Sequence, residues 1–169
     1  MMRSRIKSIL LAGRFLLGCA LLAASAGWLE AQTPVTPAPT PTPSKSTLTV
    51  RITGFRNAKG RVNIALFRDA KGFPSEPGSA VAAQKLEIDP QTLTATAVFK
   101  DIPQGSYAVA VLHDENLTGK MEFDAQGIPL TGYGFSNNPV SAGPPSPDQA
   151  KFTANQAETT IEIKLIYWQ

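Results

Sequence analysis

The chain has 169 residues, of which 43% are hydrophobic, so there is room for one ordinary domain with a core. Its formal net charge of +3 does not indicate a nucleic-acid partner, because the excess is confined to the N-terminus. Residues 1–31 hold four of the 16 basic residues and one of the 13 acidic ones, and 12 of each remain beyond them.

The N-terminal segment has the pattern of a secretory signal peptide. A basic stretch over residues 1–14 precedes an uncharged apolar run over residues 15–26, which ends in small residues. Cleavage is predicted after Ala26 or Ala31, so residues 1–31 are assigned to the signal peptide. The alternative is a retained membrane anchor, which is disfavoured because the run is shorter than the roughly 20 apolar residues of a spanning helix.

Cys19, the only cysteine, lies inside this run. Residues 16–19 read LLGC and resemble the lipobox of a bacterial lipoprotein, so a lipid anchor through Cys19 is a second alternative. Only four apolar residues separate Arg14 from Cys19, which favours ordinary cleavage. The mature chain then has no cysteine and neither a disulfide nor a thiol nucleophile.

Residues 32–45 form a predicted spacer, and residues 46–169 form the predicted domain. The spacer begins QTPVTPAPTPTP, in which proline removes backbone donors and threonine supplies no core. We expect it to be extended and semi-rigid.

Beyond the spacer, apolar residues alternate with polar ones, which is the period of a half-buried β-strand. Alternation over residues 48–52 and 62–66, with a turn at 57–60, predicts a β-hairpin. Further strands are predicted over residues 81–88, 93–100, 106–113, 150–154 and 159–167.

The segment 106–113 is apolar on both faces, so we expect it to be a central strand. No segment after residue 44 shows a sustained helical period. About seven short strands joined by turns predict an all-β fold, an antiparallel immunoglobulin-like β-sandwich.

The longest predicted connection covers residues 113–139, and its first half resembles a calcium loop. Oxygen-bearing side chains alternate there and a glycine follows, which allows ligands to converge on one ion. The candidate metal ligands are Asp114, Asn116, Thr118 and Glu122. The twelfth position, where a bidentate glutamate belongs, is Ala125, so the sequence permits only a weak calcium site. The alternative, which we favour, is a polar turn whose side chains hydrogen-bond their own backbone.

The second half of this connection is rich in glycine and aromatic residues. Tyr133 and Phe135 either face a ligand or tuck over the open end of the sandwich, and the burial of large rings favours tucking. Gly132→Val or Gly134→Val should impair folding if these glycines hold positive φ, which β-branched residues resist. The candidate binding residues of the whole connection are His113, Asp114, Asn116, Tyr133, Phe135 and Asn137.

Several motifs occur in order along the domain. They are GSYAV at 105–109, HDEN at 113–116, GK at 119–120, GIP at 127–129, GYGFSNN at 132–138, GPP at 143–145 and AKF at 150–152. Together they resemble the bacterial exported proteins grouped as domain of unknown function 2141, over roughly residues 46–167. The resemblance implies a secreted or envelope β-sandwich and lends no established activity.

The chain departs from the loop usual in that family, which resembles HDENGNGKLD. Leu117 replaces a flexible glycine, and Thr118 is a weaker oxygen ligand than asparagine. Glu122 also differs from the usual residue. These departures weaken the case for an ion.

His113 is the only histidine, so every histidine-dependent mechanism must run through it. Asp114 follows directly and should point to the opposite face of the strand, which argues against a catalytic pair. We expect the imidazole to cap the strand end, with its nitrogens satisfied by the following loop. No catalytic residue and no cofactor is assigned, and one histidine without a domain cysteine cannot form a zinc tetrad.

The leading interpretation is an exported, non-enzymatic β-sandwich module, secreted or periplasmic, that binds or supports an envelope protein or a glycan. The alternative is a hydrolase or metal-dependent enzyme that uses His113 and nearby carboxylates, which must then converge in a concave pocket. Neither a nucleic-acid partner nor a retained membrane span is expected.

Overall fold

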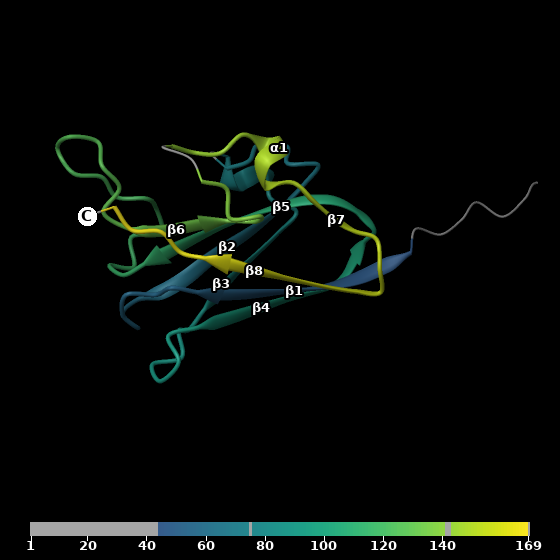
Figure 1. Ribbon diagram of the computed structural model, residues 1–169, viewed down its shortest axis with the longest axis horizontal. Coiled ribbons are helices and arrows are strands. Elements are labelled where there is room, and N and C mark those ends of the chain that lie inside the picture. Colours follow the sequence, from purple (N-terminus) through teal and green to yellow (C-terminus); the bar gives the residue numbers. More distant parts are fainter. Residues whose placement is uncertain (1–43, 75, 141–142, 169) are drawn as a thin grey trace, which may run out of the picture. The chain divides into compact units, whose positions relative to one another are not determined.

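The computed structural model describes residues 44–74, 76–140 and 143–168 (Figure 1). The predicted signal peptide over residues 1–31, Cys19 and the spacer residues 32–43 lie outside the described residues, so these assignments stay predictions. The first strand begins at Lys45, one residue before the predicted domain boundary. Within the described part of the chain, no helix has the length and apolar character needed to cross a membrane.

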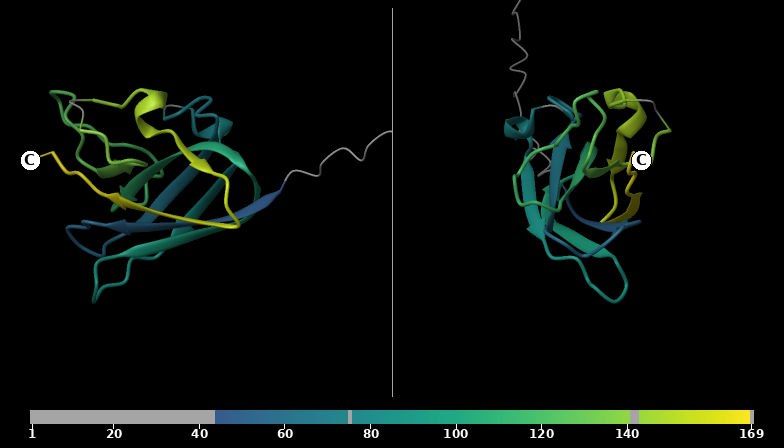
Figure 2. Two further views of the ribbon diagram at one scale, coloured as in Figure 1. Left: turned by 45° about the vertical axis from the view of Figure 1, so that its right-hand side comes forward. Right: turned by 90° about the vertical axis from the view of Figure 1, so that its left-hand side faces the viewer.

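Strands dominate the structure and form two sheets that stack as layers (Figures 1 and 2). The strands are β1 (Lys45–Thr53), β2 (Arg61–Arg68), β3 (Ala82–Leu86), β4 (Ala95–Pro103), β5 (Gly105–Asp114), β6 (Gly132–Phe135), β7 (Phe152–Ala154) and β8 (Glu158–Lys164). A short 3-10 turn (Pro77–Ser79) and a one-turn helix, α1 (Pro147–Ala150), lie in the connections.

One sheet has the order β4-β1-β8, and the other has the order β3-β2-β5-β6, with β7 also paired to β5. Neighbours are antiparallel except β1 and β8, which are parallel from Thr47↔Glu158 to Thr53↔Lys164. The predicted fold class, an antiparallel immunoglobulin-like β-sandwich, is confirmed, and β5 is the central strand that its two apolar faces indicated.

The predicted hairpin between residues 48–52 and 62–66 is wrong. Both segments are strands, but β1 pairs with β4 and β8 whereas β2 pairs with β3 and β5, so the two lie in different sheets. The connection over residues 54–60 carries the chain across the sandwich, and Gly54 and Gly60 at its ends have φ of 80° and 69°. Alternation fixes which side chains face inward but not which strand lies alongside, so it could not exclude this crossover.

Strand β6 was not predicted, since half of its four residues are glycine, which is depleted in strands. Gly132 and Gly134 are not among the glycines with positive φ, so backbone conformation is not the reason for glycine at these positions. Glycine is needed at both positions because a larger residue would collide with a neighbouring side chain. A Cβ on Gly132 would lie 2.3 Å from Cε1 of Tyr167, and one on Gly134 would lie 2.7 Å from Cγ2 of Ile163.

The core fills the space between the two sheets. Its fully or almost fully buried members include Leu48, Val50, Ile52, Val62, Ile64, Leu66, Ala97, Phe99, Tyr107, Val109, Val111 and Ile163. A second, smaller apolar cluster covers the outer face of β5 and β2 and consists of Phe67, Ala70, Phe73, Ala108 and Ala150, with Phe135 packed against it. Strand β5 is therefore packed on both faces.

Val109→Ala should lower the free energy of unfolding by about 1 to 3 kcal/mol, because it shortens a side chain that is 0% exposed in the central strand. Val98→Ala on the outer face of β4 is the matched control, since Val98 is 39% exposed and should change little. Chemical denaturation of both variants measures the difference. Equal midpoints for the two would contradict the central position of β5.

Candidate functional site

Asp114 ends strand β5 and organises the turn that follows. Its side chain is completely buried and accepts hydrogen bonds from the Asn63 side-chain amide (3.0 Å) and from the backbone N–H groups of Thr118 (2.8 Å) and Gly119 (3.0 Å). Burial acts to raise the pKa of Asp114, but these hydrogen bonds and the charge of Arg61 together lower it below its ordinary value. The carboxylate therefore holds the start of the loop, as the polar-turn interpretation expects.

His113 lies beneath the same loop and is also completely buried. Its Nε2 donates to the carbonyl oxygen of Lys59 (2.8 Å), because a carbonyl can only accept. In the neutral ring, Nδ1 then accepts from the hydroxyl of Tyr167 (2.7 Å). The expectation that both nitrogens are satisfied is correct, but the partners come from the β1–β2 connection and the C-terminal segment rather than from the following loop.

Arg56 and Glu115 form an ion pair at the edge of this buried network. The Nε of Arg56 lies 2.7 Å from Oε1 of Glu115, and the Asn57 amide donates to Oε2 (3.0 Å). Burial acts to raise the pKa of Glu115, but the hydrogen bonds from Asn57 and Arg56 and the charge of Arg56 lower it overall. The guanidinium also lies over the Tyr167 ring, 4.8 Å from its centroid, and Nη2 donates to the Leu130 carbonyl (3.3 Å).

The four candidate metal ligands are only partly brought together. Asn116 donates to Oε2 of Glu122 (2.9 Å), and the Thr118 hydroxyl donates to the Lys120 carbonyl (3.3 Å). Asp114 sits below them with both of its oxygens engaged by protein donors. Among the described residues, no group of three or more His, Cys, Asp and Glu side chains lies close enough to hold a metal ion. A calcium site here stays a prediction.

Millimolar calcium is expected to leave the melting temperature of the protein unchanged, because the hydrogen bonds that engage both Asp114 oxygens must be lost before the carboxylate can bind an ion. Thermal melts in calcium chloride and in sodium chloride of the same ionic strength provide the comparison. A calcium-specific rise that disappears in Asp114→Ala would establish the weak site instead.

The loop between β5 and β6 projects as a small hairpin over residues 122–130, which we call the arm. Leu130 N–H donates to the Glu122 carbonyl and Asp124 N–H to the Ile128 carbonyl, both at 2.9 Å. The Asp124 carboxylate accepts from the backbone N–H groups of Gln126 and Ile128 and so closes the turn. Three apolar side chains of the arm face solvent: Phe123 is 57% exposed, Ile128 41% and Leu130 51%.

Two adjoining hollows, which we call the groove, lie between the arm, β6 and the C-terminal segment. The apolar hollow has a volume of about 310 Å³ and is lined by Met121, Phe123, Gly127, Ile128, Pro129, Tyr133, Phe135, Gly143, Pro144 and Trp168. The polar hollow has a volume of about 230 Å³ and is lined by Arg56, Glu115, Asn116, Glu122, Leu130, Thr131 and Trp168. Trp168 is therefore the wall that the two hollows share.

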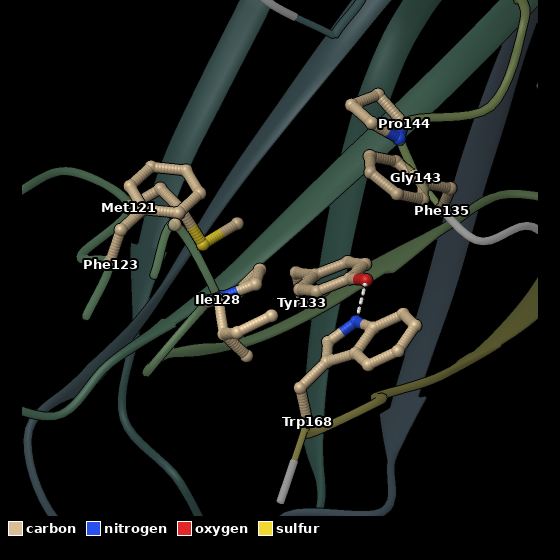
Figure 3. A pocket seen from close by; sticks show the side chains of 10 residues that line it. Met121, Phe123, Ile128, Tyr133, Phe135, Gly143, Pro144 and Trp168 are labelled. Carbon is tan, nitrogen blue, oxygen red and sulfur yellow. Dashed lines mark hydrogen bonds between the residues drawn. The ribbon is translucent and has the colours of Figure 1, made fainter. Parts of the chain in front are cut away.

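Figure 3 shows how the apolar hollow is built. Met121 and Phe123 lie at one end and Phe135 and Pro144 at the other, with the Tyr133 ring between them. The indole N–H of Trp168 donates to the Tyr133 hydroxyl, which fixes the indole beside that ring. Trp168 is nevertheless 40% exposed and lines both hollows, so part of the fixed ring is accessible from the groove.

The candidate binding residues divide into three groups. Tyr133 and Phe135 line the apolar hollow and Asn116 lines the polar one. Tyr133 is buried and Phe135 is half-buried, but the two rings pack on the outer face of the sheet rather than over its open end. His113 and Asp114 are buried and line neither hollow, and Asn137 instead donates to the backbone carbonyls of Gln149 and Lys151 beside α1.

The residues that complete the groove were missed from the sequence, above all Trp168, Phe123 and Arg56. A signal for them existed in the apolar residues scattered through a polar loop. Nine large apolar side chains are exposed among the described residues, and six of them lie on the loop or the C-terminal segment: Leu117, Phe123, Ile128, Leu130, Ile166 and Trp168. Such a concentration is typical of interaction surfaces.

Comparison with known proteins gives one match in sequence. A family model described as an uncharacterized protein conserved in bacteria (DUF2141) matches residues 50–162. No curated protein matches the chain.

Two solved structures are distantly similar to the chain. A fimbrial assembly protein from Parabacteroides distasonis ATCC 8503 is similar at 10% identity with a TM-score of 0.35, over 73% of this chain and 53% of that one. A pilus-presented adhesin, Spy0125 (Cpa), is similar at 16% identity with a TM-score of 0.26, over 74% of this chain and 28% of that one. The chain thus spans about half the length of the first and little more than a quarter of the second.

Proposed function

The chain belongs to the bacterial DUF2141 family, and on that premise we propose that it is an exported, non-enzymatic module of the cell envelope that binds a partner through the groove and the arm. The observation that carries the proposal is the apolar hollow beside an arm whose Phe123, Ile128 and Leu130 face solvent. Exposing large apolar side chains costs stability, so their concentration around one concave site favours a binding role.

The buried network supports a binding role over catalysis. A general base must reach the proton that it removes, whereas His113 is 0% exposed and both of its ring nitrogens have partners within the protein. Asp114 is likewise buried and engaged on the opposite face of the strand. Neither residue lines the groove.

Leu117 adds to the support for a binding surface. It holds a positive φ of 60°, a conformation that favours glycine, and its side chain is 56% exposed. A leucine at such a position costs backbone strain, and more than half of its side chain stays exposed within the described part of the chain. Contact with a partner would offset both costs.

Binding to the cell envelope tests the proposal. The purified exported protein should sediment in a saturable manner with an envelope fraction of the bacterium that produces it. Phe123→Ser should weaken this binding at least about tenfold, as expected for an aromatic anchor of an interface. The substitution should leave the stability of the fold unchanged, because Phe123 is 57% exposed. Val98→Ser, an exposed apolar position on β4, is the matched control and should bind like the wild type. Absence of saturable binding, or equal binding of the wild type and Phe123→Ser, would contradict the proposed function.

A further inference from the structure

The charges around the polar hollow do not balance. Arg56 and Glu115 neutralise each other at 2.7 Å, and both oxygens of Glu115 are occupied, by Arg56 and by Asn57. Glu122 accepts one hydrogen bond, from the Asn116 amide, and no cation of the described chain lies within ion-pair distance of it. One carboxylate of the groove is therefore left without a cationic partner.

That carboxylate lines the same hollow as the exposed indole of Trp168. A cation is attracted both by a carboxylate and by the face of an aromatic ring, most strongly by tryptophan. The alkyl stem of a lysine or arginine side chain also packs well along apolar surface while its charged head stays at a polar site. The apolar hollow suits the alkyl stem of such a side chain and the polar hollow suits its charged head, with Trp168 between them.

The apolar surface continues beyond the hollows. Leu117 on the loop is 56% exposed and Ile166 on the C-terminal segment is 42% exposed, and neither of them lines either hollow. A small ligand held within the groove would leave these side chains in water, whereas a polypeptide segment that lies across the groove would cover them. The extent of the apolar surface thus favours a protein partner.

We propose that the partner is a protein segment that places a lysine or arginine side chain, flanked by apolar residues, against Glu122 and the face of Trp168. This inference rests on the proposed function and specifies its ligand. Glu122 selects the charge, Trp168 holds the stem, and Phe123 and Leu130 cover the flanking apolar residues.

Trp168 provides a direct readout. The chain has two tryptophans, so a Trp28→Phe background leaves Trp168 as the single fluorophore whether or not the N-terminus is removed. The probes are capped tripeptides with leucine at both ends and lysine, norleucine or glutamate in the middle. Choline is the small-cation probe. The lysine peptide should change the Trp168 emission in a saturable manner and bind about five- to tenfold more tightly than the norleucine peptide, with a difference that shrinks as salt is added.

Glu122→Gln should remove the advantage of lysine over norleucine without removing norleucine binding, and Glu158→Gln, at the far end of β8, is the matched control. Equal binding of lysine and norleucine peptides, or an unchanged preference in Glu122→Gln, would overturn the inference. Choline binding as tight as that of the lysine peptide would assign the groove to a small cation instead. A dimer in analytical ultracentrifugation that Phe123→Ser dissociates would make a second copy of the chain the occupant and would equally overturn it.

The envelope assay separates this inference from the proposed function. If Phe123→Ser loses envelope binding while Glu122→Gln retains it, the groove binds a partner but not through a cation. If both variants bind the envelope like the wild type, the proposed function itself fails.

Discussion

Gly60→Ala should lower the free energy of unfolding by about 2 to 5 kcal/mol, the largest effect that we expect from a change so small. A Cβ at this position would lie 2.1 Å from the carbonyl oxygen of Asp114 and 2.6 Å from Cα of Glu115, and neither backbone atom can move aside as a side chain would. Gly60 also has φ of 69°, which costs an alanine about 1 to 2 kcal/mol by itself. The close contact adds an overpacking cost of about 1 to 3 kcal/mol.

Gly119→Ala is the matched control for Gly60→Ala. Gly119 has a similar φ of 78°, but a Cβ there would have nothing within 4 Å. Its cost should therefore be the backbone term alone, about 1 to 2 kcal/mol. Urea denaturation of both variants separates the cost of the positive φ from the cost of the close contact. Equal destabilisation would show that the β1–β2 connection moves away from the end of β5 and that the close packing at Gly60 is not required.

Asp114→Ala should destabilise the fold by about 2 to 4 kcal/mol. It leaves the hydrogen-bond donors of Asn63, Thr118 and Gly119 without their acceptor. Asp101→Asn is the control. The Asp101 carboxylate is 72% exposed and forms a surface ion pair with Lys45, so its loss should be undetectable. Denaturation midpoints at neutral pH give the comparison, and a loss for Asp114→Ala no larger than that for Asp101→Asn would contradict the role of the buried carboxylate.

The same carboxylate predicts a dependence of stability on pH. The pKa of Asp114 is lower in the folded protein than its ordinary value, so the folded state favours the ionised form. Its contribution to stability is present above the unfolded-state pKa of about 3.9 and is lost as the pH falls through the lower folded-state pKa. Asp114→Asn should flatten the loss of stability below about pH 4. If the free energy of unfolding of that variant falls below pH 4 as steeply as that of the wild type, the loss of stability would be assigned to other carboxylates such as Glu115.

The strands could be predicted from the sequence because period-two alternation reports a local property, the side of the sheet on which each side chain lies. Residues 106–113 are the clearest case, since Ala108 and Ala110 back Val109 and Val111 and so indicate a strand covered on both faces. The partner of each strand is not a local property. The crossover between β1 and β2, and the pairing of β6 with β5, follow from contacts that no neighbouring residues encode.

The groove escaped prediction for the same reason. Trp168, Arg56 and Phe123 come from the C-terminal segment, the β1–β2 connection and the arm, which only the fold brings together. The polar loop could be interpreted because Asp114 contacts residues four and five positions along the chain. The partners of the His113 ring could not be predicted in this way, since Lys59 and Tyr167 are each 54 positions away from His113.

The parallel pairing of β1 and β8 has a consequence for the rate and order of folding. Register partners such as Thr47 and Glu158 are separated by most of the domain, and parallel pairs between chain ends are among the slowest contacts to form. Until the last strand is available, Val50 and Ile52 lack a neighbour on one side of their sheet. A chain emerging from the ribosome therefore cannot complete the β4-β1-β8 sheet until Glu158–Lys164 has been synthesised.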